Sequence, residues 1–396
     1  MVTNTQITTG YKQTDIGVIP EDWDIDVIKS HASITTGAKN TQDKINEGSY
    51  PFFVRSQNIE RINSYSFDGE AVLTAGDGVG TGKVFHYING KFDFHQRVYK
   101  MSDFSEKLDG YFFYLYFSTH FYDRIMSMTA KSSVDSVRME MIANMHIPLP
   151  PKPEQKAIAL ALLDIATLVT KLDELIEKKR SIKQGTMQEL LTGKRRLPGF
   201  SGEWEEKKLG ELAEFYKGKG LPKSAIVEDG KFKCIHYGEL FLKYAEEINE
   251  ILSHTDQSEG NFLSKANDVL MPTSDVTPNG LATASCIRED NVILGGDILV
   301  IRSSVLLDGT FLSYSIANDR DQIMSLVSGT TVYHLYASDM SKFEFKLPDL
   351  KEQQSIVQIL NDMDIELEDL ETQRNKYLDF KQGMMQQLLT GKIRLV

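Results

Sequence analysis

At 396 residues, the chain is long enough for two or three domains, each with its own core. It is 41% hydrophobic and 25% charged, as an ordinary soluble globular protein is, and its formal net charge of −12 argues against a polyanion-binding surface spread over the whole molecule. The two cysteines are too few for a disulfide framework, the first residues lack the blocks of a signal peptide, and no run approaches membrane-spanning length. We therefore expect a cytoplasmic protein, whose contact with any nucleic acid would be local or shared with another subunit.

The chain contains an internal repeat. Residues 148–197 align without a gap onto residues 346–395, with 21 of 50 pairs identical. Further upstream, a tryptophan-containing segment at 21–37 runs alongside 202–218. The chain thus consists of two copies of one unit, each a mixed globular segment followed by a long helix.

The globular segments show short apolar runs broken by Gly, Asn, Asp and Pro, which is typical of strands. In the first copy, Asn89-Gly90 predicts a hairpin turn between two strands. The aromatic-rich segment 108–126 is long and bounded by turn residues, which predicts a buried helix. In the second copy, "GGDILVIRSS" predicts a strand.

Each long helix begins at a proline-marked entrance, "IPLPPKPEQ" or "FKLPDLKEQ", with acidic residues in its first turn. Apolar residues then recur at alternating steps of four and three, the spacing of a coiled-coil seam. The seam residues are Ile158, Leu162, Ile165, Val169, Leu172 and Ile176 in the first copy, and Ile356, Leu360, Met363, Leu367 and Leu370 in the second. Tyr377 continues the second series one turn beyond a break at Arg374. We expect the helices to end near Gly193 and Gly391, and Lys194, Arg195 and Arg196 to complement the negative end of the first helix.

A helix with one apolar stripe must bury it, and its copy in the same chain is the nearest partner. Antiparallel pairing would bring the C-terminus back to the first globular domain. We therefore predict an α+β protein in which two mixed α/β domains are separated by two long antiparallel coiled-coil helices, with a pseudo-twofold, circular organisation. The predicted boundaries are 1–152 for the first domain, 153–197 for the central helix, 198–350 for the second domain and 351–396 for the C-terminal helix.

Two globular domains and two similar helices that carry "MQELLTGKRRL" and "MMQQLLTGKIRL" resemble the specificity (S) subunit of type I restriction–modification enzymes. The opening "YKQTDIGVIPEDWDIDVI", its counterpart "RRLPGFSGEWEEKKLGEL", the entrance "IPLPPKPEQKAI" and the segment "HQRVYKM" are similar to that family as well. The resemblance covers essentially the full length, and its motifs are specific in combination rather than singly.

The resemblance implies a non-catalytic reader of double-stranded DNA. Each globular domain would be a target-recognition domain for one half of a bipartite sequence. The helices would set the spacing of the halves and dock two methyltransferase (modification) subunits, which restriction subunits would join. S-adenosylmethionine, ATP and magnesium would belong to those partner subunits, and this chain would bind no cofactor or metal of its own.

The segment "TAGDGVGTGKVF" (74–85) has the glycine content of a phosphate-binding loop. A Walker motif would need Gly where Asp77 stands and Ser or Thr where Val84 stands, so a tight glycine-rich loop is the simpler interpretation. Its backbone amides and Lys83 would then be available to phosphate. The sequence has neither an Asn/Asp-Pro-Pro-aromatic methyltransferase motif nor a metal-ligand spacing of His and Cys, which predicts that the chain is not an enzyme.

Candidate DNA-binding residues are polar side chains at strand ends and in loops, since Arg suits guanine, Asn and Gln suit adenine, and Lys and hydroxyls mostly hold phosphate. In the first domain they are Arg55, Gln57, Asn58, Lys83, His95, Gln96, Arg97, Lys131, Ser132 and Ser133. In the second domain they are Lys219, Lys223, His236, Tyr237, Thr273, Ser274, Asp275, Arg302, Thr330, Thr331 and Tyr333. Any one of them is equally well explained as a solvated surface residue or a turn cap, and His95 as a buried structural residue. The alignment pairs Arg55 with His236 and residues 131–133 with 329–331, which favours these positions.

Two other classes of function compete with a DNA reader. A self-contained methyltransferase would release heat on binding S-adenosylmethionine, and the missing motif disfavours it. A scaffold with paired helices and no DNA role would fail to shift DNA in a mobility assay of the assembled complex.

Overall fold

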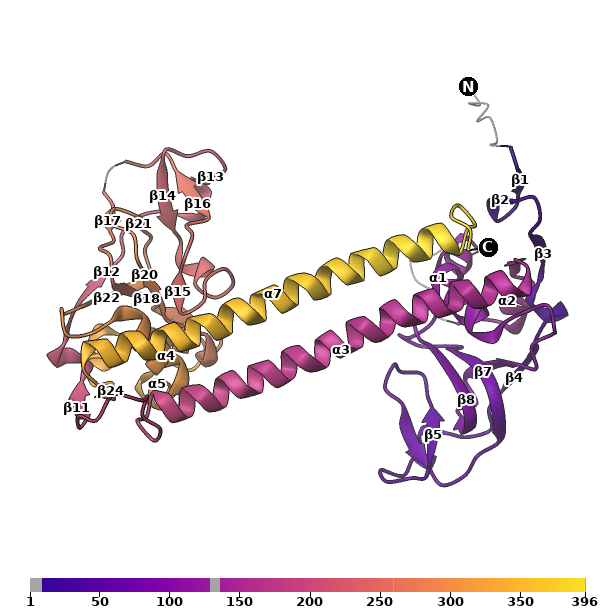
Figure 1. Ribbon diagram of the computed structural model, residues 1–396, viewed down its shortest axis with the longest axis horizontal. Coiled ribbons are helices and arrows are strands. Elements are labelled where there is room, and N and C mark those ends of the chain that lie inside the picture. Colours follow the sequence, from indigo (N-terminus) through magenta and orange to yellow (C-terminus); the bar gives the residue numbers. More distant parts are fainter. Residues whose placement is uncertain (1–8, 129–135, 259, 396) are drawn as a thin grey trace. The chain divides into compact units, whose positions relative to one another are not determined.

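The computed structural model describes residues 9–128, 136–258 and 260–395. The chain divides into two compact units: unit 1 comprises residues 1–171 and 373–396, and unit 2 comprises residues 172–372. Helix α3 (Lys152–Leu190) begins in unit 1 and ends in unit 2, and helix α7 (Leu350–Leu388) begins in unit 2 and ends in unit 1. The predicted combination of mixed α/β domains and two long helices is confirmed (Figure 1).

Unit 1 is built on a six-stranded sheet in the order β4-β9-β7-β8-β5-β6, with β5 parallel to β8. Two two-stranded sheets, β1-β2 and β3-β10, complete its β-structure. The strands are β1 Tyr11–Thr14, β2 Gly17–Pro20, β3 Asp24–Val27, β4 Ser33–Thr36, β5 Tyr50–Phe53, β6 Glu60–Ile62, β7 Phe67–Ala75, β8 Phe85–Phe94, β9 Val98–Ser102 and β10 His146–Leu149. The helices, besides α3 and α7, are α1 Gly110–Ser127, α2 Met139–Ala143 and the 3-10 turns η1 Ile28–Ser30 and η2 Thr41–Asp43.

Unit 2 holds two five-stranded sheets, β12-β22-β18-β20-β15 and β13-β16-β14-β21-β17, and the short pairs β11-β24 and β19-β23. The strands are β11 Glu205–Lys208, β12 Ala213–Lys217, β13 Ile226–Val227, β14 Phe232–Ile235, β15 Glu247–Ile248, β16 Ser253–Thr255, β17 Phe262–Leu263, β18 Asp268–Pro272, β19 Ser274–Asp275, β20 Ser285–Ile287, β21 Ile293–Leu294, β22 Ile298–Ser303, β23 Tyr333–His334 and β24 Glu344–Leu347. The helices are α4 Gly309–Asn318, α5 Arg320–Leu326, α6 Ala337–Met340 and the 3-10 turns η3 Leu209–Glu211, η4 Lys223–Ala225, η5 Tyr237–Glu239 and η6 Pro278–Ala282.

The two globular domains share one strand arrangement. In unit 1 the single strand β8 pairs antiparallel with β7 and parallel with β5. In unit 2 the same two pairings are divided between β20, which is antiparallel to β18, and β21, which is parallel to β14. The internal repeat is therefore a repeat of fold as well as of sequence, and interruption of one strand splits the sheet of the second copy in two.

The Asn89-Gly90 hairpin prediction is wrong. Both residues lie inside β8, where Asn89 faces Glu70 and Gly90 faces Gly69 across the β7–β8 ladder. The two facing glycines have φ angles of +150° and +144°, and the β7–β8 register continues through them without interruption, so the chain does not reverse at this point. The buried aromatic helix is confirmed as α1, whose N-terminal amides are capped by Asp109.

The long helices run antiparallel within each unit. In unit 2, the ion pairs Lys179–Glu366 and Lys183–Asp364 join them, so residue numbers rise along α3 as they fall along α7. In unit 1, the first turns of α3 pack in the same core as Leu388 and Tyr377 near the end of α7. In an isolated helix, the apolar side chains at these positions would be exposed to water. Pairing of the two helices buries them.

The seam residues of α3 are all buried, each with at most 9% of its surface exposed. On α7, Ile356 and Leu360 are buried, whereas Met363, Leu367, Leu370 and Tyr377 are only half-buried. The second half of the α7 stripe is therefore covered less completely than the stripe of α3.

Both helices close at glycines, as predicted: Gly193 and Gly391 each have φ of +69°. The basic residues that follow do more than complement the helix end. Arg394 donates from Nε and Nη2 to the two carboxylate oxygens of Glu154 at 2.6 and 2.8 Å, and the indole N–H of Trp23 donates to the same carboxylate at 3.0 Å. In unit 2, Arg196 and Trp204 hold Glu352 in the same way. We call each of these sets of three residues a latch.

Candidate nucleic-acid interface

Four segments of unit 1 converge on a polar hollow. Its lining includes four of the residues predicted from sequence: Arg55 after β5, and His95, Gln96 and Arg97 between β8 and β9. The other lining residues are Asn40, Thr41, Gln42 and Asp77. Residues far apart in the sequence thus form one surface of hydrogen-bonding groups, which is what recognition of base edges and phosphates requires.

The floor of the hollow is held by backbone hydrogen bonds. His95 N donates to Phe53 O at 2.9 Å, and Gln96 N donates to Lys39 O at 2.8 Å. The His95 ring is buried, and its Nδ1 accepts from the backbone N–H of Arg97 at 2.9 Å. Burial lowers the pKa of His95, and the neighbouring charges of Arg55 and Arg97 lower it further, so the ring remains a neutral acceptor at neutral pH. His95 therefore fixes the loop that presents Gln96 and Arg97.

Above this floor, the carboxylate of Asp77 accepts a hydrogen bond from Arg55 and forms a longer ion pair with Arg97. Arg55 Nη1 lies 2.8 Å from Asp77 Oδ1, and Arg97 Nε lies 3.6 Å from Asp77 Oδ2. The Arg97 side chain remains 64% exposed and that of Asp77 24%. Gln96 is oriented by a 2.6 Å bond from its side-chain amide to Asn40 Oδ1. The hollow is thus ordered before any ligand arrives.

The remaining candidates of the first domain lie outside this hollow. Gln57 and Asn58 are exposed in the turn after β5, where Ser56 Oγ donates to the Asn58 carbonyl. Lys83 is exposed, with its ammonium 5.5 Å from the ring of Tyr122. Lys131, Ser132 and Ser133 lie outside the described residues.

Equivalent backbone hydrogen bonds set the register between the two domains. Three bonds in unit 1 have counterparts in unit 2: Gly76 N to Arg97 O with Thr273 N to Asp297 O, His95 N to Phe53 O with Gly295 N to Ile235 O, and Gln96 N to Lys39 O with Gly296 N to Gly220 O. This register pairs Arg55 with Tyr237, and not with His236 as the sequence alignment predicted. One extra residue between Gly218 and Gly230, compared with Gly37 to Gly48, accounts for the shift.

At the positions of Arg55, Asp77 and Arg97, unit 2 therefore carries Tyr237, Ser274 and Asp297. Two arginines and a carboxylate are replaced by a phenol, a hydroxyl and a carboxylate, while the backbone frame is kept. Asp297 pairs with Lys217 at 3.2 Å. The same frame thus presents different hydrogen-bonding groups in the two copies.

The structure brings together several predicted residues of the second domain. Ser274 and Asp275 face His334 and Tyr333 through the β19–β23 pair, and Thr273 accepts from Leu335 N. The rings of His236 and Tyr237 lie 4.7 Å apart. Lys219, Lys223, Thr330 and Thr331 are exposed.

Arg302 has a different environment from the other candidates. Its Nε and Nη2 donate to the two oxygens of the buried Asp268 at 2.9 and 2.8 Å, and its guanidinium lies 4.9 Å from the ring of Tyr216. The hydrogen bond to Asp268 is the main reason that the pKa of Arg302 is raised. These contacts place Arg302 in the packing of the β12-β22-β18 sheet.

Sequence reasoning missed Asp77, Asn40 and Asp297 as members of these surfaces. Asp77 was visible only as the residue that breaks a Walker motif, although an acid between two loops that carry arginines is itself a signal. The repeat contained a second signal, because Gly76 and Thr273 align through the neighbouring strands β7 and β18. Asn40 and Asp297 carried no signal of their own.

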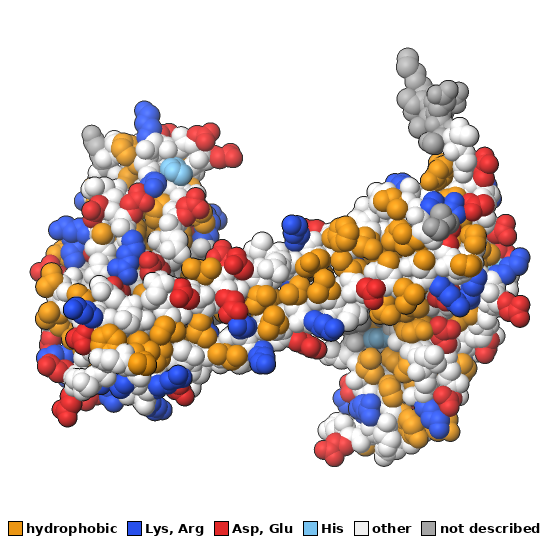
Figure 2. Space-filling view, viewed as in Figure 1, with side chains coloured by type: hydrophobic (Ala, Val, Ile, Leu, Met, Phe, Trp, Pro, Cys, Tyr) orange, Lys and Arg blue, Asp and Glu red, His pale blue; other side chains and the backbone are white. Residues whose placement is uncertain are grey.

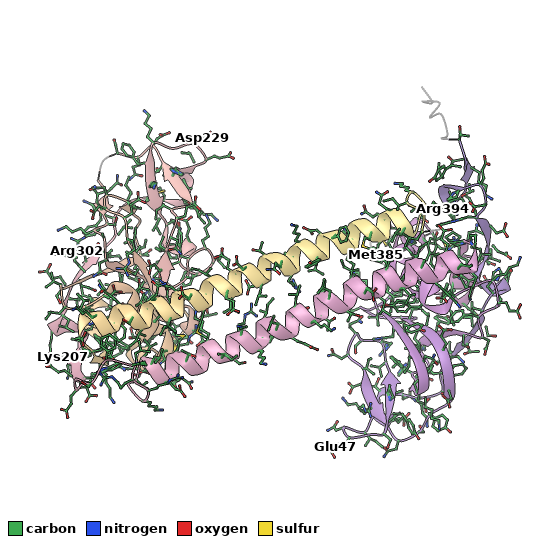
Figure 3. All side chains as sticks on the ribbon, in the orientation of Figure 1. Glu47, Lys207, Asp229, Arg302, Met385 and Arg394 are labelled. Carbon is green, nitrogen blue, oxygen red and sulfur yellow. The ribbon has the colours of Figure 1, made fainter. Side chains whose placement is uncertain are left out.

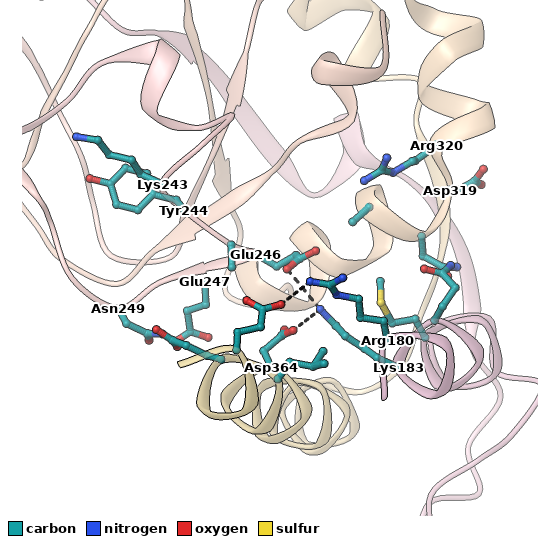
Figure 4. Close-up of a pocket in the computed structure, with 18 of the residues that line it drawn as sticks. Arg180, Lys183, Lys243, Tyr244, Glu246, Glu247, Asn249, Asp319, Arg320 and Asp364 are labelled. Atoms are coloured by element: carbon teal, nitrogen blue, oxygen red, sulfur yellow. Dashed lines mark hydrogen bonds and ion pairs between the residues drawn. The ribbon is translucent and has the colours of Figure 1, made fainter. Parts of the chain in front are cut away.

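A second hollow lies in unit 2, beside the helix pair (Figure 4). Its lining contains four basic residues, Arg180, Lys183, Lys243 and Arg320, against eight acidic ones, Glu246, Glu247, Glu250, Asp319, Asp321, Asp364, Glu368 and Glu371. Arg180 and Lys183 are already paired with Glu371 and Asp364. The excess of carboxylates repels phosphate, so this hollow does not suit nucleic acid.

The charge distribution agrees with a local interface. Figure 2 shows basic and acidic side chains interspersed on the visible face of each unit.

Among the residues that the structure describes, no cluster of three or more His, Cys, Asp or Glu side chains could hold a metal ion. Burial raises the pKa of Cys234 to about 11 and that of Cys286 to about 12, so both thiols stay protonated at neutral pH. Over the described ranges, no helix has the length and apolarity to cross a membrane.

The chain is similar to specificity subunits along nearly its whole length. The type I restriction enzyme MjaVIII specificity subunit of Methanocaldococcus jannaschii is 23% identical over an alignment of 423 residues that covers 95% of this chain and 94% of the relative. The putative MjaX specificity subunit of the same organism is 26% identical over 429 residues, with 97% of each chain covered. The crystal structure of the type I restriction–modification system S subunit from M. genitalium shares the fold, with a TM-score of 0.65 at 16% identity over 95% of this chain and 97% of that one.

The family profile described as type I restriction modification DNA specificity domain matches the chain twice, at residues 20–183 and 201–379. The two matches correspond to the two copies of the internal repeat. Together they cover both globular domains and most of both long helices. The chain therefore belongs to the family of type I restriction modification DNA specificity domains.

Proposed function

We propose that this chain is the DNA specificity subunit of a type I restriction–modification complex. Each globular domain reads one half of a bipartite target in double-stranded DNA, and the chain itself carries out no catalysis. One observation carries the proposal: two copies of one backbone frame present different polar groups at equivalent positions, with Arg55, Asp77 and Arg97 in one copy and Tyr237, Ser274 and Asp297 in the other. A common frame with exchanged side chains is the arrangement expected for two different half-sites.

Exchange of the first domain tests this proposal. Residues 11–150 are replaced by the corresponding segment of a relative, and the adenines methylated by the assembled complex are mapped along a genome. We expect one half of the recognised sequence to change while the other half and the spacer are kept. The matched control exchanges residues 202–348 and is expected to alter only the opposite half. A change in both halves from a single exchange would contradict independent reading.

In the same proposal, the long helices set the spacing of the half-sites and dock two methyltransferase subunits, which restriction subunits join. Each helix is continuous from one unit into the other, which suits a spacer. Outside the seam, α3 exposes Leu160 and Leu163, which line an apolar hollow with Tyr87 and Tyr111. Exposed apolar side chains beside a hollow are typical of a subunit interface. S-adenosylmethionine, ATP and magnesium would be supplied and bound by the partner subunits.

Substitution of this apolar surface should weaken assembly. For Leu160→Glu combined with Leu163→Glu, we expect the affinity for the methyltransferase subunits to fall at least about tenfold, since two leucine side chains can no longer be buried. Isothermal titration of the full chain with the purified methyltransferase measures this. Thr170→Glu, at an exposed polar position of the same helix, is the matched control and should bind as the parent does. Equal affinity of the double variant would show that the partner docks elsewhere.

A further inference from the structure

The polar hollow of unit 1 contains an arrangement that goes beyond general DNA binding. We infer that Arg97 reads a guanine in the half-site of the first domain, and that Asp77 is the positioning residue that orients it. The inference rests on the proposed function, because it assumes that this hollow faces DNA. It adds which base is read, by which side chain, and how that side chain is held.

The guanidinium of Arg97 presents hydrogen-bond donors to solvent. Its Nε faces Asp77 Oδ2 at 3.6 Å, and its side chain is 64% exposed. Within the described parts of the chain, Nη1 and Nη2 of Arg97 have no hydrogen-bond or ion-pair partner. Both nitrogens are therefore available to donate to a ligand. Two parallel N–H donors match the O6 and N7 acceptors that guanine presents in the major groove, and no other base offers that pair.

The orientation of Arg97 depends on Asp77 and on its own backbone contacts. An exposed arginine loses rotamer freedom when it binds, and the ion pair with Asp77 at 3.6 Å reduces that cost by restricting the side chain beforehand. The Arg97 backbone is fixed as well, because its N–H donates to buried His95 and its carbonyl accepts from Gly76 N at 2.8 Å. A Cβ at Gly76 would lie 3.0 Å from the Arg97 carbonyl oxygen, so a small residue is needed for this close approach.

The two arginines offset the negative charge of Asp77. Asp77 alone would repel the DNA backbone, but Arg55 contacts its other oxygen at 2.8 Å. Two arginines and one carboxylate leave a net charge of +1, with His95 neutral. Arg55 thereby permits a carboxylate at a DNA-facing surface. In unit 2 the corresponding positions are Tyr237, Ser274 and Asp297, which lack an arginine fork, so the same reading of guanine is not expected from the second domain.

The test uses the full chain assembled with its methyltransferase subunits, and selection from DNA randomised in both half-sites. The parent is expected to select guanine at one position of the half-site that domain exchange assigns to residues 11–150. In Arg97→Ala, preference for that guanine should fall about 5- to 150-fold, the range for loss of a bidentate base contact, while all other positions are unchanged. Arg97→Lys, which keeps the charge and loses the fork, should also lose the preference.

Asp77→Asn separates orientation from charge. We expect weaker selection for the guanine together with unchanged or tighter binding to mismatched DNA, because a negative charge is removed. Lys107→Ala, at an exposed lysine of the same unit, is the charge-matched control for Arg97→Ala and should keep the selected sequence. Arg97 is exposed, so its replacement by alanine should not disturb the fold. An unchanged urea midpoint of unit 1 would show that the variant is folded.

Three results would overturn the inference while leaving the proposed function intact. The first is a parent that selects a sequence without guanine in the first half-site. The second is an Arg97→Ala variant that still selects the guanine. The third is uniform weakening on all sequences with a salt slope reduced by about 1, the signature of a phosphate contact. A parent complex without any sequence preference would overturn the inference and the proposed function together.

Discussion

Replacement of Arg394 by alanine is expected to destabilise unit 1 by about 3–5 kcal/mol, the range for breaking a buried ion pair by removing one partner. Glu154, which accepts both of the Arg394 bonds, is only 1% exposed. Without Arg394, its carboxylate would keep the indole N–H of Trp23 and lose its counter-charge. Arg394 also pairs with Asp22 at 2.8 Å, and the hydrogen bond from Arg394 is the main reason that the pKa of Asp22 is lowered. Figure 3 labels Arg394 beyond the C-terminal end of α7.

The chain allows a clean measurement, because Trp23 and Trp204 are its two tryptophans and one belongs to each unit. In a Trp204→Phe background, the fluorescence of Trp23 reports unfolding of unit 1 in urea. Arg394→Ala should lower the midpoint strongly, and hydrogen exchange should show faster opening of residues 389–395. Lys392→Ala, at an exposed lysine of the same terminal segment, is the matched control and should have little effect. Similar midpoints for the two variants would refute a stabilising latch.

The opposite latch provides an internal comparison. Arg196 holds Glu352 and Trp204 in the same geometry, but it lies only eight residues before Trp204 in the chain. Loss of Arg394 removes one of the contacts that tie the terminal segment to Trp23, whereas after loss of Arg196 the chain itself keeps the segment close to Trp204. We therefore expect local opening, measured by hydrogen exchange, to increase more for Arg394→Ala than for Arg196→Ala.

The long helices could be predicted from the sequence because their signals are local and repeated. A seam at steps of four and three, a proline entrance and a closing glycine each act within a few residues, and the repeat supplied every signal twice. The latch was equally present in the repeat, as Trp23 with Trp204, Glu154 with Glu352 and Arg394 with Arg196. It was not recognised because the helix-end role of a basic residue is a local explanation, whereas the actual partner of Arg394 lies 240 positions away at Glu154.

The candidate interface shows where sequence reasoning ends. Arg55, His95, Gln96 and Arg97 were found because polar residues after strands tend to share an edge of the sheet. The alignment of Arg55 with the second copy was off by one residue, since a loop between two glycines can gain a residue without changing the flanking strands. Asn89-Gly90 failed for a related reason: the dipeptide favours a turn, but long-range pairing with β7 overrides that local preference. Non-local pairing decides such cases, and composition does not encode it.

Arg302 was a candidate base-contacting residue, but its contacts with Asp268 indicate a structural role. Replacement of Arg302 by alanine is therefore expected to destabilise unit 2 by about 3–5 kcal/mol. Asp268 is 1% exposed and would retain one backbone bond, from Lys265 N at 2.8 Å, in place of the bidentate pair. The rings of Tyr216 and Phe262 would also lose their contact with the guanidinium. Trp204 fluorescence in a Trp23→Phe background measures the urea midpoint of unit 2.

Replacing the pair by apolar side chains provides the control for this prediction. In Arg302→Met combined with Asp268→Leu, no charge is left buried without a partner, so stability should be close to that of the parent or above it. Both variants, once assembled with the methyltransferase, should select the parent's sequence in the second half-site, because the Arg302 side chain is directed to Asp268. A variant with normal stability and an altered second half-site would instead identify Arg302 as a base-contacting residue and place the C-terminal end of β22 on the DNA.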